Sequence, residues 1–151
     1  MFYELQHGFR EKRSCESQLL MLVDDLFKSV YQKKQTDLSV LDFSKAFDKV
    51  SHEKLALKIH CYGIRGPALI WFKGFLDNRH QSVIVNGSSS EPIPVSSGVP
   101  QGSELGPVLF LIYMNDLPMN VKSKVRLFAD DTALYLTIST SSPNRDSSER
   151  Y

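Results

Sequence analysis

Two adjacent carboxylates in an apolar segment are the residues of this sequence best suited to chemistry. Asp130 and Asp131 lie between two runs that are typical of β-strands, residues 125–128 and 133–138. Strand interiors disfavour aspartate, and two neighbouring negative charges repel unless a cation lies between them. Upstream, Asp42 lies at the end of another apolar, strand-like run. Three acids at strand ends indicate a site for a hard divalent metal ion, of the kind that handles phosphates.

The local backbone decides whether these acids could share one metal region. In a regular strand Asp130 and Asp131 would point to opposite faces, whereas at the tip of a tight hairpin both could lean the same way. Asp42, at the end of a neighbouring strand, would complete the cluster. Two Mg²⁺ ions held there could activate an attacking hydroxyl and stabilise a leaving pyrophosphate. The alternative is structural, because aspartate is also a favoured turn residue and a helix cap.

The segment 42–48 is a second candidate constellation. A helical turn after the strand would place Phe47 about one and a half turns beyond Asp42, over the same site. A bulky ring there could occlude space beside a bound sugar. The alternative is that Phe43 and Phe47, four residues apart, are core residues on one helical face. We interpret Asp48 as structural.

The loop 97–103 is a third constellation. Gly98 and Gly102 permit the backbone to approach a ligand closely, and Gln101 offers both a donor and an acceptor. The loop lies just before an expected helix N-terminus, which suits an anionic or base-paired partner. A loop of this composition is also an ordinary turn.

Composition sets broader limits. The chain has 151 residues, a hydrophobic fraction of 42% and a net charge of +1, so bulk charge does not attract it to nucleic acid. Basic residues cluster at 10–13, 33–34 and 122–126, and each cluster could be a solvated face or a phosphate-binding patch. Cys15 and Cys61 have neither metal-ligand spacing nor a disulfide pattern. The longest apolar run, residues 108–114, is too short to span a bilayer, and no signal peptide begins the chain. We therefore expect a soluble intracellular protein without membrane partners.

The pattern of the chain predicts an α+β fold with one domain at residues 1–138. Expected helices are 14–33, 51–61, one that begins at Pro67, and 104–116; expected strands are 37–43, a hairpin at 81–95, and a last hairpin that carries Asp130 and Asp131. Residues 139–151 are polar and Ser-rich, and we expect this tail to be disordered. The antiparallel sheet should contain strands 37–43, 125–128 and 133–138, backed by helices 54–61 and 104–116. The helix 14–33 and the hairpin 81–95 should pack around it.

Taken together, three segments resemble the palm motifs of reverse transcriptases. They are Leu-Asp-Phe-Ser-Lys-Ala-Phe-Asp at 41–48, Ser-Gly-Val-Pro-Gln-Gly-Ser at 97–103 and Phe-Ala-Asp-Asp at 128–131. The sequence is most similar to the enzymes of non-LTR (LINE-type, jockey-like) retrotransposons. Flanking segments agree, namely 7–10, 63–64 with Trp71, 79–83, 105–110 and 115–118. The resemblance covers roughly residues 5 to 137, and it implies a reverse-transcriptase palm with part of the fingers.

This resemblance implies a role for each matched residue. Asp42 and Asp130 would be the principal metal ligands, and Asp131 the third acid, with two Mg²⁺ ions that Mn²⁺ could replace. The backbone carbonyl of Phe43 would face the metal, and Phe47 would act as a steric gate against a ribose 2′-hydroxyl. The remaining substrate contacts would be Gln101 and Gly102, beside the incoming nucleotide and template, and Arg10, near a phosphate.

The family reaction would be RNA-directed DNA synthesis by two-metal nucleotidyl transfer, which extends a primer 3′-hydroxyl. Its partners would be an RNA template, a DNA primer and dNTPs. No segment upstream of His7 resembles the family's fingers, and no thumb follows Ile138. We therefore expect weak or no activity from this chain alone. The alternative is a catalytically inactive retrotransposon remnant that at most binds nucleic acid or a partner. Oligomeric state, and nucleus or cytoplasm, stay open.

Overall fold

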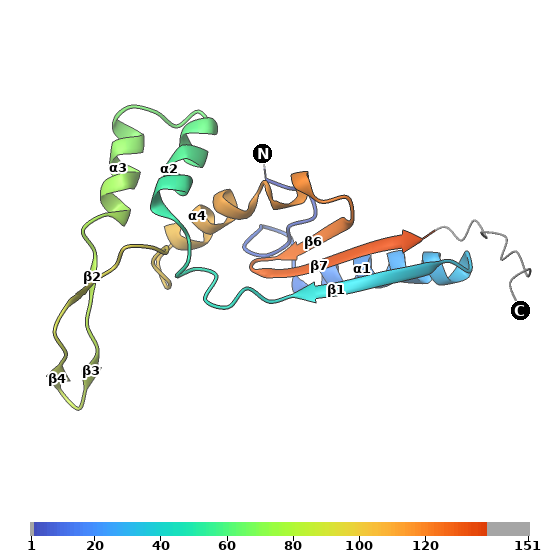
Figure 1. Cartoon of the computed structure of the whole chain (residues 1–151), viewed down its shortest axis with the longest axis horizontal. Coiled ribbons are helices and arrows are strands. Elements are labelled where there is room, and N and C mark those ends of the chain that lie inside the picture. The colour runs from blue at the N-terminus through green and yellow to red at the C-terminus, as the bar shows by residue number, and fades with distance from the viewer. Residues whose placement is uncertain (1, 139–151) are drawn as a thin grey trace, which may run out of the picture.

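Helices and short antiparallel strands alternate along the chain (Figure 1). The structure is a computed structural model that describes residues 2–138. The elements are α1 Cys15–Tyr31, β1 Gln35–Leu41, α2 His52–Cys61, α3 Pro67–Leu76, β2 His80–Gln81, β3 Ile84–Val85, β4 Ser88–Ser89, β5 Ile93–Pro94, α4 Leu105–Met114, the 3₁₀ helix η1 Leu117–Asn120, β6 Lys124–Phe128 and β7 Asp131–Ile138. The mixed α and antiparallel β composition is as predicted. The expected disordered tail lies outside the described residues.

The principal sheet has three antiparallel strands in the order β1-β7-β6. Strands β6 and β7 form a tight hairpin in which Phe128 pairs with Asp131, so that Ala129 and Asp130 make the turn. Strand β1 pairs along the whole of β7, from Gln35 opposite Ile138 to Leu41 opposite Thr132. The three strands predicted for the sheet therefore form it, although Asp131 belongs to β7 and β1 ends one residue before Asp42.

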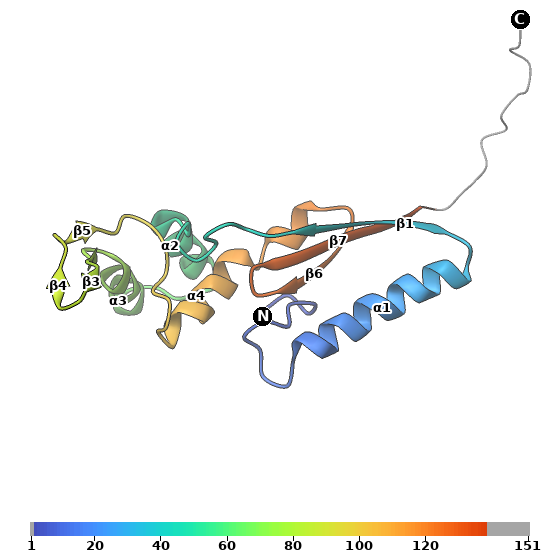
Figure 2. The same ribbon diagram turned by 90° about the horizontal axis from the view of Figure 1, so that it is seen from below.

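Helix α1 lies along one face of this sheet (Figure 2). Its start is fixed by a capping box, in which the Ser14 hydroxyl accepts from the Ser17 amide and the Ser17 hydroxyl accepts from the Ser14 amide. The two buried side chains of this helix, Gln18 and Ser29, are polar, whereas Leu22 and Leu26 are half-buried. The contact of this helix with the sheet therefore depends on hydrogen bonds as well as on apolar packing.

A second core forms away from the sheet, between α2, α3 and α4 (Figure 1). Its buried apolar residues are Val50, Leu55, Ile59, Leu76, Val99, Leu109, Phe110 and Ile112. We expected α2 and α4 to back the sheet, and this was wrong: α1 is the sheet's main helical partner, whereas α2 packs against α3 and α4. Helix α4 is apolar on most of its surface, so it can bury one side against α2.

The segment after Asp42 also differs from the prediction. Residues 44–49 form turns rather than a helix, and Lys45 has a φ of 55°. The expected hairpin at 81–95 is present, with two short ladders and a turn in which Asn86 and Gly87 both have positive φ. That turn is the one that an Asn-Gly pair favours. The expectation that the hairpin packs around the three-stranded sheet was wrong, because it lies at the opposite end of the molecule from β1 and β7 (Figure 1).

Candidate active site

The turn that carries Asp130 is held from outside the sheet by Gln6. The Gln6 side-chain oxygen accepts hydrogen bonds from the amides of Ala129 (3.0 Å) and Gly8 (2.8 Å), and its Nε2 donates to the Ala129 carbonyl (3.1 Å). Gln6 is 3% exposed, so these hydrogen bonds are shielded from solvent. Ala129 has a φ of 55°, a conformation that side chains other than glycine seldom adopt. The clamp stabilises that conformation.

The backbone of Gly8 packs directly against this turn. A Cβ atom on Gly8 would lie 2.0 Å from the Ala129 amide nitrogen, so no larger residue fits without a shift. Neither Gln6 nor the contact of Gly8 was singled out from the sequence. The only signal was their position at the start of the region that resembles the family.

The strand that leads into the turn is fixed as well. The Leu127 amide donates to the Leu5 carbonyl (3.0 Å), and the His7 amide donates to the Leu127 carbonyl (2.9 Å). Gln18 on α1 donates from Nε2 to both carbonyls, Leu5 at 2.6 Å and Leu127 at 2.8 Å. The N-terminal segment, α1 and β6 are thus connected through one set of buried hydrogen bonds.

The three predicted acids lie at one end of the sheet. Leu41, the last residue of β1, pairs with Thr132, the second residue of β7. Asp42 directly follows Leu41 and Asp131 directly precedes Thr132, so both lie at the same end of the sheet. Asp130 occupies the turn and is half-buried, whereas Asp42 and Asp131 are exposed. Carboxylates of this kind suit a hard divalent cation. Among residues 2–138, however, no group of three or more His, Cys, Asp and Glu side chains is close enough to hold a metal ion. The metal site itself therefore stays a prediction.

Phe47, Gln101 and Gly102 line one hollow of about 500 Å³, together with Phe9 and with residues of the start of α4. The Phe47 ring stacks on Phe110, with centroids 4.2 Å apart and an interplanar angle of 11°, and meets Phe9 edge-on at 6.0 Å. Phe47 is thus both packed on the core and in contact with the hollow. Three of the predicted substrate-binding residues come together here.

The loop 97–103 is anchored to the segment after Asp42. The Gly98 amide donates to the Val50 carbonyl (2.8 Å) and the Val99 amide to the Phe47 carbonyl (2.9 Å). Gly98 has a φ of 89°, and a Cβ there would lie 2.7 Å from the Asp48 Cα. We expected Gly98 to let the backbone approach a ligand closely. In the structure the Gly98 backbone instead packs closely against the backbone of Asp48. Gly102 keeps open space around it.

The other two predicted contact residues lie apart from this hollow. Arg10 donates to the Tyr3 carbonyl (3.1 Å), and its guanidinium lies over the Phe2 ring at 5.8 Å. Phe43 is half-buried, directly after Asp42. Arg10 thus holds the N-terminal segment in this structure, and its phosphate contact stays a prediction.

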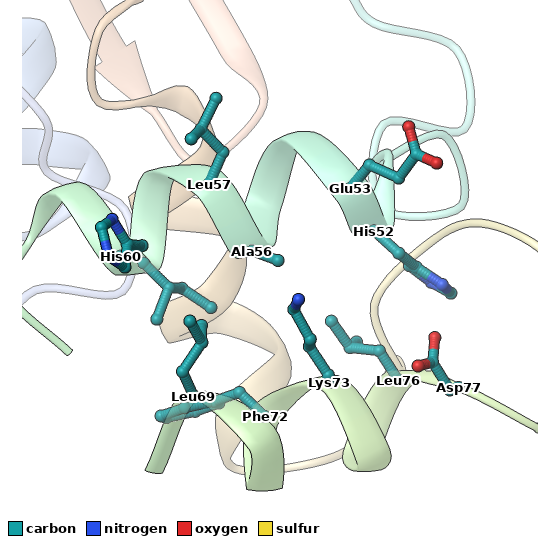
Figure 3. A pocket seen from close by; sticks show the side chains of 11 residues that line it. His52, Glu53, Ala56, Leu57, His60, Leu69, Phe72, Lys73, Leu76 and Asp77 are labelled. Carbon is teal, nitrogen blue, oxygen red and sulfur yellow. The ribbon is translucent and has the colours of Figure 1, made fainter. Parts of the chain in front are cut away.

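A separate groove of about 470 Å³ lies between α2 and α3 (Figure 3). Leu69 and Phe72 line one part of it, and His52 and Asp77 lie at the other end, with Lys73 between the helices. None of the predicted site residues lines this groove. Its walls belong to the second core.

A network of charged and polar side chains lies where α1 meets the sheet. Arg126, 5% exposed, donates to Asp25 (2.6 Å) and to the Tyr135 hydroxyl (2.7 Å), and Tyr135 donates to Asp25. Burial alone would raise the pKa of Asp25, but hydrogen bonds from Tyr135, Arg126 and Lys124 outweigh it and lower that pKa to about 2. Burial and the bond to Asp25 raise the pKa of Tyr135 to about 12. This network stabilises the sheet that carries the acids.

The class of protein follows from the comparison with known families. The family profile described as "Reverse transcriptase (RNA-dependent DNA polymerase)" matches residues 1–144. The chain belongs to the reverse transcriptase family. Its similarity to the jockey-like enzymes of non-LTR retrotransposons is confirmed as well.

Two similar proteins from Drosophila melanogaster illustrate this match. The chain is 34% identical over 136 residues to the "Probable RNA-directed DNA polymerase from transposon X-element". The aligned region covers 87% of this chain and 15% of that protein. The chain is 33% identical to the "RNA-directed DNA polymerase from mobile element jockey", with the same coverage of 87% and 15%. The chain therefore spans about 15% of the length of these relatives. No helix within residues 2–138 is long and apolar enough to cross a membrane.

Proposed function

We propose that this chain carries the catalytic acids and nucleotide contacts of an RNA-directed DNA polymerase. The reaction is extension of a primer 3′-hydroxyl by dNTPs on an RNA template, as the names of the relatives suggest. The region corresponds to the palm of such an enzyme with part of its fingers. Because the chain spans a small share of its relatives, the activity of the whole enzyme is proposed rather than observed.

One observation supports this proposal most strongly. Gly8 packs against the turn at Ala129, and its neighbour Phe9 meets the ring of Phe47 and lines the hollow with Gln101. Two consecutive residues thus connect the end of the sheet that carries the acids to the predicted nucleotide contacts. A reaction between a primer end and a nucleotide needs its acids and its nucleotide pocket held together in this way.

In this proposal the acids hold the reacting groups. Asp42 and Asp130 would be the main ligands of two divalent ions, Mg²⁺ or Mn²⁺, and Asp131 and the Phe43 carbonyl would offer further oxygens. The ions, when bound, supply a more acidic primer hydroxyl and charge compensation for the leaving pyrophosphate. The clamped turn keeps Asp130 oriented, because Ala129 is bonded at both its amide and its carbonyl.

The hollow orients the nucleotide. Phe47 excludes a 2′-hydroxyl because its ring is fixed between Phe9 and Phe110 and yields little space. Gln101 offers an amide to the nucleotide or template, and Gly102 leaves room for the backbone to approach. Arg10 would contact a phosphate after leaving its present bond to Tyr3.

Primer extension tests this proposal. We expect the purified chain to incorporate dTTP only weakly on poly(rA)/oligo(dT) with Mg²⁺ or Mn²⁺, and we expect Asp130→Asn to abolish that incorporation. Asp77→Asn, which removes an exposed carboxylate at the end of α3, is the matched control and should retain activity. Folded wild-type chain that incorporates nothing would overturn the proposal and select the alternative, a remnant without catalysis.

A further inference from the structure

Lysines from two distant parts of the sequence meet around one hollow of about 360 Å³. One part is the C-terminal half of α1 with the turn after it, and the other is the start of β6 with the loop before it. The lysines that line the hollow are Lys28, Lys34, Lys122 and Lys124. In the sequence Lys34 belongs to one basic cluster and Lys122 and Lys124 to another, each of which could be no more than a solvated face. The fold places them together, and we call this surface the lysine hollow.

The charge of the lysine hollow is positive after its ion pairs are counted. Asp25 is the one acid that lines it among the described residues, and Arg126 (2.6 Å) and Lys124 (3.1 Å) already compensate that carboxylate. Lys28 pairs with Asp24 on its own helix. Within residues 2–138, neither Lys34 nor Lys122 has an ion pair, and both are exposed. Two uncompensated ammonium groups therefore lie at the edge of the hollow.

The lysine hollow is remote from the acids. It is lined by Tyr135 and Thr137, near the far end of β7, whereas Asp131 begins that strand. Thr137 lies six positions beyond Asp131 along the strand, which corresponds to about 20 Å. A group bound in the hollow would therefore contact the protein outside the proposed reaction centre.

We propose that the lysine hollow binds the phosphodiester backbone of nucleic acid. Lysine presents a point charge rather than a planar fork, so it suits contacts to phosphate that do not depend on base sequence. Membership of a family of nucleic-acid polymerases favours a polynucleotide as the source of that phosphate. The inference does not depend on catalysis, because backbone binding needs none of the three acids.

The size of the effect follows from counterion release. Each phosphate contact contributes about 0.9 to the slope of log K against log salt, which is about an eightfold change in affinity per lysine at 0.1 M salt. Replacing both uncompensated lysines should therefore weaken binding by between about 10-fold and 60-fold and lower the slope by nearly two.

The test is fluorescence anisotropy of the whole chain with a labelled RNA duplex over a range of salt. The variant is Lys34→Gln/Lys122→Gln, and Lys54→Gln/Lys73→Gln is a control that removes the same charge from exposed positions on α2 and α3. We expect weaker binding and a smaller salt slope for the first variant only. RNA binding is measured without dNTP or divalent ions, so its loss in the first variant is a separate result from absence of nucleotide incorporation by the wild type. Thermal unfolding confirms that each variant is folded.

A second measurement uses the unmodified protein. Bound RNA should protect Lys34 and Lys122 from acylation while Lys54 and Lys73 stay reactive. Equal losses of RNA binding in both double variants, or no measurable RNA binding at low salt, would overturn the proposal. Binding to inorganic phosphate alone, or to phosphatidylserine vesicles in parallel with RNA, would mark a general anion patch and overturn the assignment to nucleic acid.

Discussion

Gln6 bonds to Ala129 through both polar atoms of its side chain, accepting from the amide and donating to the carbonyl. The two residues lie near opposite ends of the described chain, so this contact can form only when the N-terminal segment has docked on β6. It holds the turn between Phe128 and Asp131 in a left-handed conformation. The position of Asp130 thus depends on a residue that does no chemistry itself.

Removal of this clamp should destabilise the fold. Gln6→Ala deletes three buried hydrogen bonds and leaves the Ala129 amide and carbonyl without that partner, and we expect a loss of about 2–3 kcal/mol in the free energy of unfolding. Urea denaturation measures it. Gln81→Ala, at an exposed position of β2, is the control and should change stability by less than about 0.5 kcal/mol. Equal stability of Gln6→Ala and wild type would contradict the clamp.

The contact of Gly8 with the turn gives a second prediction. Gly8→Ala places a Cβ where the Ala129 backbone lies, so the segment must move and unfolding should become easier by about 1–3 kcal/mol. Gly74→Ala is the matched control, because nothing lies within 4 Å of its Cβ position within α3. Alanine there should be neutral or stabilising by up to about 1 kcal/mol. Similar thermal midpoints for the two variants would show that the Gly8 contact is not tight.

The Asp25–Arg126 pair predicts how stability depends on pH. The pKa of Asp25 is lowered in the folded chain to about 2, from an ordinary 3.8, so its contribution is present above pH 4 and is lost as pH falls through 2. This pKa shift corresponds to about 2 kcal/mol of stability at neutral pH. The value needs little reduction for screening by solvent, because the Asp25 side chain is only 17% exposed. Acid titration of the unfolding free energy measures it.

A substitution isolates that carboxylate. Asp25→Asn leaves Arg126 buried without its counter-ion, so we expect about 3 kcal/mol of destabilisation at pH 7 and a flatter acid profile than in the wild type. Asp24→Asn changes the neighbouring exposed carboxylate and should keep the profile. If the stability of Asp25→Asn depended on pH in the acid range as that of the wild type does, groups other than Asp25 would cause the acid dependence.

The ring of Phe47 predicts nucleotide choice. Phe47→Val removes bulk beside the hollow, so incorporation of ribonucleotides relative to deoxynucleotides should rise by about tenfold or more. The ratio of kcat/KM for UTP and TTP on poly(rA)/oligo(dT) measures it. Phe110 stacks under Phe47, and Phe110→Leu serves as a comparison that loosens the core without opening the hollow. An unchanged ratio in Phe47→Val would contradict the role of Phe47 as a steric gate.

The sequence was sufficient for the strands that carry the acids because local patterns determine them. The apolar runs before Asp42 and around Asp130 are β-like in themselves, and Asn86–Gly87 dictates its own turn. Packing was less predictable. The helix that covers the sheet is held there by contacts such as Asp25 with Arg126 and Gln18 with Leu127, which join distant residues and which no local pattern contains.

The same reason explains what sequence reasoning missed in the site. Gln6 looks like any polar residue until β6 lies beside it, and Lys34 becomes a neighbour of Lys122 only in the folded chain. Phe47 and Gln101 line one hollow, and turns together with the bond from Val99 to Phe47 bring them there, whereas a helix was expected after Asp42.

The most direct test of the account is metal binding at the end of the sheet that carries the acids. Electron paramagnetic resonance should detect Mn²⁺ bound to the chain in the presence of dTTP, because substrate phosphates complete the coordination that carboxylates begin. We predict that Asp42→Asn and Asp130→Asn each weaken this binding by at least about tenfold, and that Asp77→Asn leaves it unchanged. Equal Mn²⁺ affinity in all four proteins would contradict the central claim that these acids form the metal site.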